Sequence, residues 1–391
     1  MRQVPLDFGK GAALLGDEER AAVDRVMRSR SLFRYYGPDL QGTVAAFEAG
    51  VRAQLGVGYA VAVSSGTAAL RCALAALGIG PGARVVVPAF TFIATVNAVV
   101  AAGATPVFAE VDDTLSVDPG SIPAGADTII AVHIENVVGD MDALLAAAGA
   151  TPVVEDAAQA FGATYRGRAA GAIGALGCFS LQLEKNITAG EGGVVTTGDE
   201  RLYLRASRYQ DQGGQFVTSY ASSRGEELTE PFAAENLRMG EVAGAIAGVQ
   251  LGRLPSILGA LRASKRRILD GVGTIDGLTP RRVPDAGGDG GSSCMWFLPD
   301  QAAAKRFGKG LVARGVPCAQ MYRGEPVYWN PAVLARRTAT GTGDWVAEKG
   351  LCPRTEALVA RNVIVPIGVR YTPDDCDEIA GAIRAVAAEV L

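Results

Sequence analysis

Short apolar runs and longer amphipathic runs alternate along the chain from about residue 58 onward. The short runs are rich in Val, Ile and Ala and stand between turn residues, which is typical of buried strands. They predict strands over residues 60–63, 84–87, 106–109, 129–132 and 152–155. Apolar residues at helical spacing between them predict helices over residues 67–77 and 92–102. Strands that alternate with helices predict an α/β fold with a mostly parallel, buried sheet.

The two flanks of this alternating region have patterns of their own. A helix is predicted over residues 17–30, because acids fill its first turn and arginines its last. The aromatic segment 31–38 follows it. A long apolar-periodic helix is predicted over residues 240–258, and helix and strand signals alternate after it. We therefore expect two domains. The N-terminal segment and a large α/β domain would form residues 1–255, and a smaller C-terminal α/β domain residues 256–391.

Composition and charge narrow the classes of function. The 391 residues carry a net charge of −4 and contain no basic run of the kind that binds nucleic acid or anionic lipid. Gly, Pro and charged residues interrupt the apolar stretches, so no membrane span is predicted. The first residues lack the apolar core of a signal peptide, and a cytoplasmic protein is expected. Six scattered cysteines and one histidine favour neither a disulfide framework nor a metal site.

Ligands of parallel sheets bind beyond the carboxyl ends of the strands, and several candidate residues fall there. Ser65, Gly66 and Thr67 follow a predicted strand and open a helix, where free N–H groups and the helix dipole favour a phosphate. An ordinary helix cap is the alternative, since Ser and Thr are common caps. Phe92 comes at the next strand-to-helix turn. Its ring could stack on a flat cofactor, or it could be a core aromatic.

A carboxylate and a lysine complete the candidate chemistry. Asp156 ends an apolar run, where an unpaired acid is costly, so it should pair with a pyridinium nitrogen or with an arginine. Gln159, one helical turn later, could reach a ring oxygen of a cofactor. Lys185 precedes a glycine-rich turn and could form a Schiff base or be a surface lysine. The ordered set of phosphate cap, aromatic, acid and lysine favours pyridoxal 5'-phosphate as the cofactor.

Taken in order, these motifs closely resemble those of the DegT/StrS family of pyridoxal-phosphate-dependent sugar and cyclitol aminotransferases. The resemblance covers nearly the whole chain, through residues 63–70, 88–95, 154–159, 185–193, 236–239 and 352–355. It implies the aspartate aminotransferase-like fold (fold type I) and a homodimer whose active sites lie at the subunit interface. It also implies that Lys185 is the Schiff-base lysine and proton shuttle and that Asp156 pairs with the pyridine nitrogen. Further cofactor contacts are implied for Ser65, Gly66, Thr67, Phe92, Gln159, Ser180 and, from the partner subunit, Asn236.

Around the expected substrate the chain departs from the family pattern. Where members often have His-Leu-Tyr-Gly, this chain has the segment His133-Ile134-Glu135-Asn136. Glu135 would accept hydrogen bonds from hydroxyls or an amine and would repel a nucleotide diphosphate, unless it turns outward. Gln182 lies in a Ser-x-Gln-x-x-Lys pattern that looks like the branch acting on cyclitols. Substrate contacts are expected from Arg34, Tyr35, His133, Glu135 and Arg238. Among these, Arg34 is the candidate for the carboxylate of the amino donor.

The resemblance implies transfer of an amino group from L-glutamate or L-glutamine to a keto-sugar or keto-cyclitol, in antibiotic or surface-sugar biosynthesis. A homodimer with shared active sites is expected, with no nucleic acid, membrane or metal as a partner. A dehydratase of the same fold is one alternative, although some relatives that remove a hydroxyl have histidine in place of the lysine. A non-catalytic regulator that binds pyridoxal phosphate is another, but no DNA-binding segment supports it.

Overall fold

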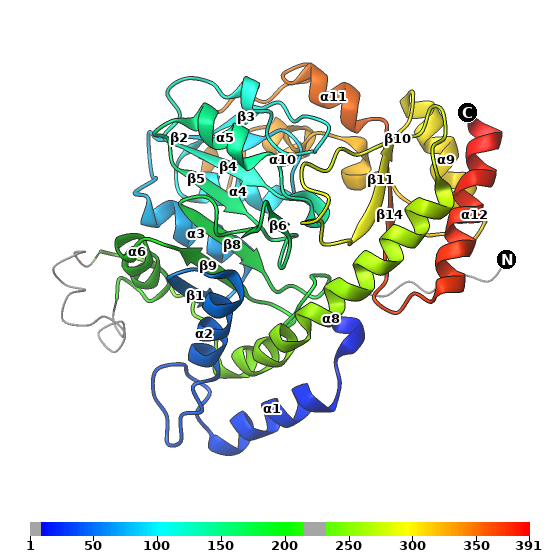
Figure 1. Ribbon diagram of the computed structural model, residues 1–391. Coiled ribbons are helices and arrows are strands. Elements are labelled where there is room, and N and C mark those ends of the chain that lie inside the picture. Colours follow the sequence, from blue (N-terminus) through cyan, green and yellow to red (C-terminus); the bar gives the residue numbers. More distant parts are fainter. Residues whose placement is uncertain (1–8, 215–231) are drawn as a thin grey trace.

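A seven-stranded sheet forms the centre of the computed structural model, which describes residues 9–214 and 232–391 (Figure 1). Its spatial order is β1-β9-β8-β5-β4-β2-β3, and β9 runs antiparallel to both of its neighbours. The other pairs in the sheet are parallel, so the predicted α/β fold with a mostly parallel sheet is confirmed. Its strands are β1 (Tyr59–Val63), β2 (Arg84–Pro88), β3 (Thr105–Ala109), β4 (Thr128–Val132), β5 (Val153–Asp156), β8 (Leu176–Ser180) and β9 (Gly193–Thr197).

Helices cover both faces of this sheet. Successive residues of a strand point to opposite faces, and the two hydrophobic clusters follow that rule. Ile129 and Ala131 of β4 belong to the cluster with α2 and α8, whereas Ile130 and Val132 belong to the cluster with α3 and α4. The described helices are α1 (Asp17–Ser29), α2 (Thr43–Leu55), α3 (Gly66–Ala76), α4 (Ile93–Ala101), α5 (Met141–Ala148), α6 (Glu200–Gln210), α8 (Glu241–Val272), α9 (Gln301–Ala313), α10 (Pro331–Leu334), α11 (Pro353–Val359) and α12 (Pro373–Val390).

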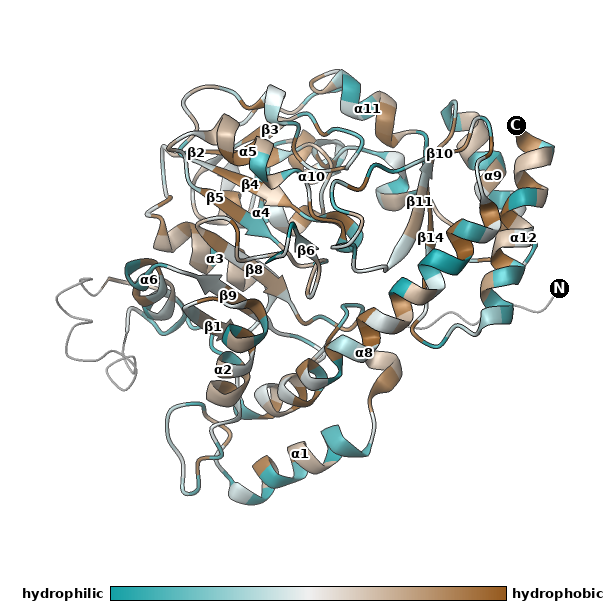
Figure 2. Ribbon diagram, viewed as in Figure 1, coloured by the Kyte–Doolittle hydropathy of each residue, from teal (hydrophilic) through white to brown (hydrophobic). Residues whose placement is uncertain are grey.

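A second, smaller sheet lies in the C-terminal part of the chain. It is antiparallel, in the order β10-β11-β14; α9 packs on β14, and α12 packs on α9 and α8. Hydrophobic residues predominate in the strands of the large sheet, whereas hydrophilic stretches lie along α1, α8 and α12 (Figure 2). The remaining strands are β10 (Thr279–Pro280), β11 (Ser293–Phe297) and β14 (Asn362–Pro366), with two short hairpins, β6 (Thr164–Tyr165) with β7 (Arg168–Ala169) and β12 (Arg337–Thr338) with β13 (Gly341–Thr342).

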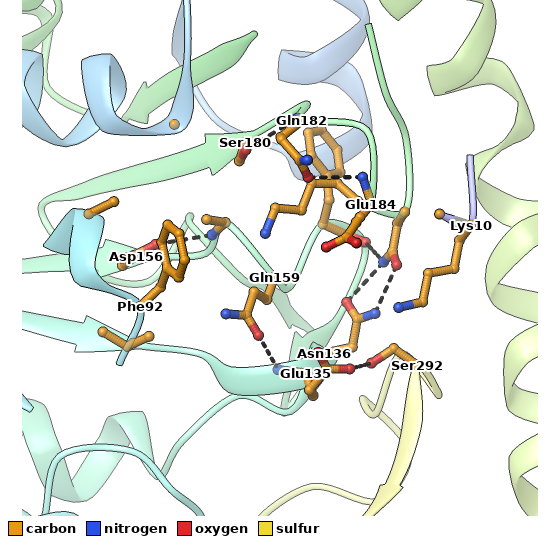
Figure 3. A pocket seen from close by; sticks show the side chains of 18 of the residues that line it. Lys10, Phe92, Glu135, Asn136, Asp156, Gln159, Ser180, Gln182, Glu184 and Ser292 are labelled. Carbon is orange, nitrogen blue, oxygen red and sulfur yellow. Dashed lines mark hydrogen bonds between the residues drawn. The ribbon is translucent and has the colours of Figure 1, made fainter. Parts of the chain in front are cut away.

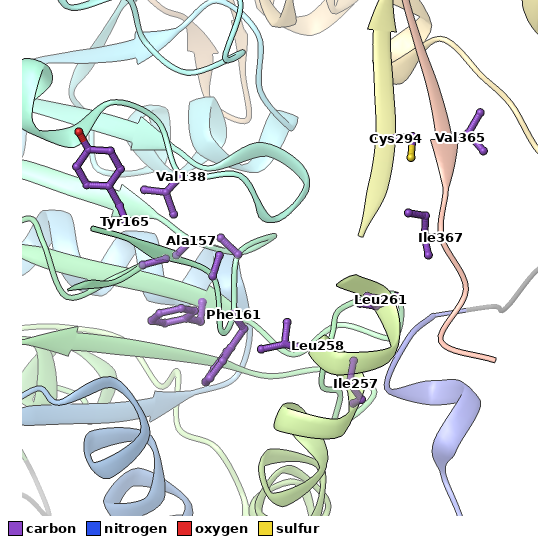
Figure 4. Packing of buried hydrophobic residues seen from close by; sticks show 14 of the residues in the cluster. Val138, Ala157, Phe161, Tyr165, Ile257, Leu258, Leu261, Cys294, Val365 and Ile367 are labelled. Atoms are coloured by element: carbon purple, nitrogen blue, oxygen red, sulfur yellow. The ribbon is translucent and has the colours of Figure 1, made fainter. Parts of the chain in front are cut away.

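Helix α8 joins the two parts of the molecule. It continues past the predicted end at Leu258 to Val272 and carries Pro255 inside it. Its residues Ile257, Leu258 and Leu261 lie between Phe161 of the large domain and the small sheet (Figure 4). Among the described helices, α8 alone is long and apolar enough to cross a membrane, but its packing is that of a core helix. The predicted domain border near residue 255 lies inside this helix, and the division into residues 1–255 and 256–391 stays a prediction.

Candidate active site

A cavity of about 690 Å³ opens at the carboxyl ends of the parallel strands (Figure 3). Residues after β14, including Ile367 and Tyr371, close one side of it, so both sheets contribute to its wall. Nine of the predicted site residues line this cavity: Ser65, Gly66, Thr67, Phe92, Glu135, Asp156, Gln159, Ser180 and Lys185. The topology thus brings together residues that are more than 100 positions apart in the chain.

The start of α3 forms one wall. The Ser65 hydroxyl accepts a hydrogen bond from the Ala68 N–H at 3.0 Å, so the predicted cap alternative holds for this side chain. Within the described residues, the N–H groups of Gly66 and Thr67 have no acceptor and remain available at the positive end of the helix dipole. A Cβ on Gly66 would lie 2.7 Å from the Ser180 Cβ, so glycine lets the helix start approach the end of β8. These N–H groups and the Ser180 hydroxyl suit an anion such as a phosphate.

Two adjacent acids at the end of β5 serve different purposes. Glu155 is fully buried and accepts hydrogen bonds from the backbone N–H groups of Gly171, Ile173 and Gly174. Asp156 points to the opposite face and lines the cavity, where it accepts hydrogen bonds from the Thr95 hydroxyl and the Ala158 N–H. Burial raises the pKa of Asp156, although these donors and Lys185 act in the opposite direction. A protonated ring nitrogen beside Asp156 would compensate that burial.

Lys185 lies in the loop between β8 and β9 and is only partly exposed. Burial lowers the pKa of its amine, while the charges of Asp156 and Glu135 oppose that shift. A larger neutral fraction makes the amine a better nucleophile and base. Lys185 lines the cavity, unlike an ordinary surface lysine, and its role as the Schiff-base lysine stays a prediction.

An exposed aromatic ring stands on the same side of the cavity as Asp156 (Figure 3). Phe92 is 55% exposed, so it is not the core aromatic that was the alternative. It caps the start of α4 and lies 6.3 Å, centroid to centroid, from Tyr322. The Tyr322 hydroxyl accepts a hydrogen bond from Gln159 Nε2 at 2.8 Å, which fixes that amide beside the cavity. A flat ring bound against Phe92 would therefore have an amide and a carboxylate near its edge.

The sequence reasoning missed several residues of the cavity, and three of them are polar residues from distant parts of the chain. Lys10, Ser292 and Tyr322 line it, and they come from the N-terminal segment and from the C-terminal part of the chain. The Ser292 hydroxyl donates a hydrogen bond to Glu135 Oε2 at 2.9 Å, so Glu135 faces inward. The only signal in the sequence for these residues is the position of Lys10 between two glycines.

Two residues that were predicted to contact the substrate, His133 and Arg34, are buried and bind acids of their own chain. His133 is fully buried, and its Nε2 donates to Glu155 Oε2 at 2.9 Å. Arg34 donates to Glu48 Oε1 at 2.7 Å and to the Ala62 carbonyl at 3.0 Å. Neither residue lines the cavity. Both acids hold these side chains in the core, and a direct role at the substrate stays a prediction.

Tyr35, Asn236 and Arg238 form a separate group outside the cavity. The Tyr35 hydroxyl accepts from Gln210 Nε2 at 2.8 Å, and Arg238 Nη1 donates to Asp211 Oδ1 at 2.7 Å. The Asn236 side chain is exposed, and its backbone bridges to Asp211. Within one chain these three residues lie outside the cavity, and their predicted contacts with the cofactor or the substrate stay predictions.

Comparison with known proteins agrees with this geometry. The model of the DegT/DnrJ/EryC1/StrS aminotransferase family matches residues 14–384. The dTDP-3-amino-3,4,6-trideoxy-alpha-D-glucose transaminase of Streptomyces venezuelae is 33% identical over 98% of this chain and 96% of its own length. The L-glutamine:2-deoxy-scyllo-inosose aminotransferase of Micromonospora echinospora is 36% identical over 58% of this chain and 56% of its own length. The structure of S. venezuelae DesV in complex with a ketimine intermediate superposes with a TM-score of 0.83, at 30% identity and 99% coverage of both chains.

The family model, the S. venezuelae transaminase and the DesV structure each match nearly the whole chain, including both sheets. They confirm the predicted fold class and the prediction of an aminotransferase. The family implies pyridoxal phosphate as the cofactor, and the donor set around the cavity has the chemistry that this cofactor requires. The chain belongs to the DegT/DnrJ/EryC1/StrS aminotransferase family.

Proposed function

We propose that this aminotransferase uses pyridoxal 5'-phosphate to move an amino group from L-glutamate or L-glutamine to a keto-sugar or keto-cyclitol. The donor leaves as a 2-keto acid and the acceptor carbonyl becomes an amine, so the exchange needs no external oxidant. The observation that carries the proposal is a buried acid, Asp156, in one cavity with a partly buried lysine, Lys185, and a free helix start. The relatives named above support acceptors of the sugar and cyclitol classes. We extend the proposal to a role in antibiotic or surface-sugar biosynthesis and to a cytoplasmic location.

Each side chain has a separate task. Bound pyridoxal phosphate supplies an electron sink for negative charge at the substrate carbon. The Gly66 and Thr67 N–H groups and the Ser180 hydroxyl would hold its phosphate, and Phe92 would stack on its ring. Asp156 would keep the proton on the ring nitrogen, which is the condition for the electron sink.

Lys185 has two tasks in this proposal. Its amine would attach the cofactor covalently before the donor binds. Once the donor's amine has displaced it, the Lys185 amine would be free to accept the proton of the donor's α-carbon and to return a proton later in the transfer. The lowered pKa of Lys185 supports the second task, because a base must be neutral before it accepts a proton.

We also propose a homodimer that completes the active sites. The segment that carries Arg34 and Tyr35 exposes apolar side chains, among them Leu32 (48%), Tyr36 (63%) and Leu40 (40%). Exposed apolar side chains of this kind favour a partner, and a second copy would cover them. Asn236, exposed and outside the cavity of its own chain, would then reach the phosphate in the partner's cavity.

Absorption spectroscopy of the purified, cofactor-loaded protein tests the central proposal. Addition of L-glutamate or L-glutamine should remove the visible band of the bound cofactor and give a pyridoxamine-like band at shorter wavelength. Addition of a keto-cyclitol or a nucleotide-linked keto-sugar should restore the first band and yield an aminated product. A band that persists with every amino donor would refute the proposal, and loss of water from the acceptor without nitrogen transfer would indicate a dehydratase.

Subunit mixing tests the shared sites. Lys185→Ala and Asn236→Ala should each be nearly inactive as pure proteins. Equal mixing and reassembly should restore about a quarter of the wild-type activity, because half of the dimers are mixed and each has one intact site. Mixed dimers without activity, at a confirmed dimeric state, would refute a role of Asn236 across the interface.

A further inference from the structure

The side of the cavity opposite Phe92 and Asp156 carries charges that the transfer chemistry does not use (Figure 3). Glu135 and Lys10 both line it, and Ser292 holds the Glu135 carboxylate by a hydrogen bond of 2.9 Å. Burial alone would raise the pKa of Glu135, but Lys10, Ser292 and Lys185 outweigh it and keep that pKa below its ordinary value. These neighbours therefore favour the charged form of Glu135 in the cavity that also holds Lys185.

The backbone at Glu135 is strained. Glu135 has a φ of 50° and Asn136 a φ of 60°, so two successive residues with side chains adopt the left-handed conformation. Each costs of the order of 1 kcal/mol, and such strain concentrates at functional sites. Three contacts hold the turn: the Glu135 N–H donates to Gln159 Oε1, the Asn136 N–H to the Gln159 carbonyl, and the Asn136 amide pairs with Asn186. The surrounding structure keeps Glu135 pointing into the cavity.

Lys10 reaches the same side from the N-terminal segment. The Gly11 N–H donates to the Lys185 carbonyl at 3.2 Å, which places the segment directly on the lysine loop. Glycine is required on both sides of Lys10, because a Cβ on Gly9 would lie 2.3 Å from the Leu183 carbonyl and one on Gly11 2.8 Å from the Asn186 carbonyl. Lys10 forms neither a hydrogen bond nor an ion pair with any residue in the described part of the chain. Its ammonium is available to a ligand.

We propose that Glu135, held by Ser292, selects L-glutamine over L-glutamate as the amino donor, while Lys10 binds the donor's α-carboxylate. This inference rests on the proposed function and specifies its donor. Both amino acids carry an α-carboxylate, which would neutralise Lys10. They differ only at the end of the side chain, where glutamine has an amide and glutamate a carboxylate.

The discrimination follows from charge. Once the donor's α-carboxylate has neutralised Lys10, the charge of Glu135 is no longer balanced. Glu135 would then accept a hydrogen bond from the side-chain amide of glutamine but repel the side-chain carboxylate of glutamate in the same low-dielectric cavity. Selection of this kind needs a repulsive element, and Glu135 supplies one. A hydroxyl-rich acceptor ring, which is neutral, would meet the same carboxylate in the second half of the reaction without repulsion.

The test compares both donors on the cofactor-loaded, full-length protein. Dissociation constants of L-glutamine and L-glutamate come from calorimetry, and the rates at which they remove the visible band come from stopped-flow absorption. The wild type should favour L-glutamine by about tenfold or more in both measurements. Glu135→Gln, which keeps the shape and removes the charge, should bring this ratio to within about threefold of one.

Two further variants separate the roles. Lys10→Met should weaken both donors by about tenfold and leave their ratio unchanged, because the α-carboxylate is common to both. Glu378→Gln is the control: Glu378 is an exposed acid of α12 outside the cavity, and its removal should change neither donor's constants.

The outcomes are distinguishable from failure of the proposed function. A wild type that binds both amino acids equally, or a ratio that Glu135→Gln does not change, would overturn the inference even if transamination proceeds. A visible band that no donor removes would overturn the proposed function, while the ratio of the dissociation constants would still decide whether Glu135 selects the amide. Circular dichroism of each variant confirms that the fold is kept.

Discussion

The proposed cofactor side and the proposed substrate side of the cavity are formed by different kinds of structural element. On the cofactor side, Ser65, Asp156 and Ser180 occupy the ends of regular strands or the start of a helix in the central sheet. On the proposed substrate side, Lys10, Glu135 and Ser292 come from a glycine-flanked segment, a strained turn and the residue before β11 of the small sheet. Regular elements fix a common chemistry, whereas irregular segments can vary without unfolding the sheet. The contrast explains how one fold can serve many substrates.

The largest expected effect lies on the cofactor side. Lys185→Ala should lower turnover by at least about a thousandfold, because it removes both the covalent attachment and the base. Steady-state assays with either amino donor measure this effect. Lys309→Ala, an exposed lysine of α9, is the control and should retain full activity. Substantial turnover in Lys185→Ala would show that another group moves the proton.

The two neighbouring acids of β5 allow a sharper separation. Asp156→Asn should lower turnover by about a hundredfold or more with little loss of stability, because the amide cannot hold the ring proton as a carboxylate does. Glu155→Gln should lower the free energy of unfolding by about 2–4 kcal/mol, since three backbone N–H groups depend on that carboxylate. Urea unfolding and kinetic assays on both variants test the pair. Equal losses of activity and stability in both would contradict the division of roles.

On the substrate side the strained turn can be tested with two substitutions at one position. Asn136→Ala should cost about 1–3 kcal/mol of unfolding free energy, because it loses the amide pair with Asn186 and keeps a side chain at positive φ. Asn136→Gly relieves the backbone strain and should recover about 1 kcal/mol of that loss. Chemical unfolding measures both values. An alanine variant as stable as the glycine variant would show that the turn is not strained.

The smallest effect concerns stability without cofactor. Lys185→Met should raise the unfolding free energy of the cofactor-free protein at neutral pH by about 1 kcal/mol, since a buried amine is removed. Burial lowers the pKa of Lys185 in the folded protein below its ordinary 10.5, so the unfolded chain binds the proton more strongly. The buried amine therefore lowers the unfolding free energy by its full amount at pH values below the pKa of Lys185 in the folded protein. This destabilisation disappears as the pH rises past 10.5. Urea titrations at several pH values would detect a variant whose advantage grows with pH, which would contradict this sign.

The sequence predicted the central sheet well, for a physical reason. Parallel strands buried on both faces form continuous apolar runs, and β2 and β4 were found to within one residue. No strand was predicted over β8, whose Gly-Cys stretch has low strand propensity, or over β9. Helix α8 was ended too early at Leu258, since the charged residues after it resemble a surface. They extend the helix to the small sheet, where Lys265 pairs with Asp289.

The candidate site was predictable only where its residues belong to the sheet. Local sequence cannot reveal which charged side chains find a buried partner, so Arg34 and His133 were expected at the substrate although Glu48 and Glu155 hold them. Lys10 and Ser292 reach Glu135 only through tertiary packing across more than 100 residues. A lysine between two glycines is a weak indication that the backbone approaches another segment closely. In the structure both glycines lie against the backbone of the loop that carries Lys185.

The single histidine of the chain has a practical consequence. The His133 N–H donates to the Asp156 carbonyl, and its ring contacts Glu155, so it adjoins both acids of β5. A protein with one imidazole gives one set of imidazole signals in a nuclear magnetic resonance spectrum. Those signals would report events at Asp156 from inside the core, without isotope assignment of the other 390 residues. The fold has thus provided a built-in spectroscopic reporter beside its proposed catalytic acid.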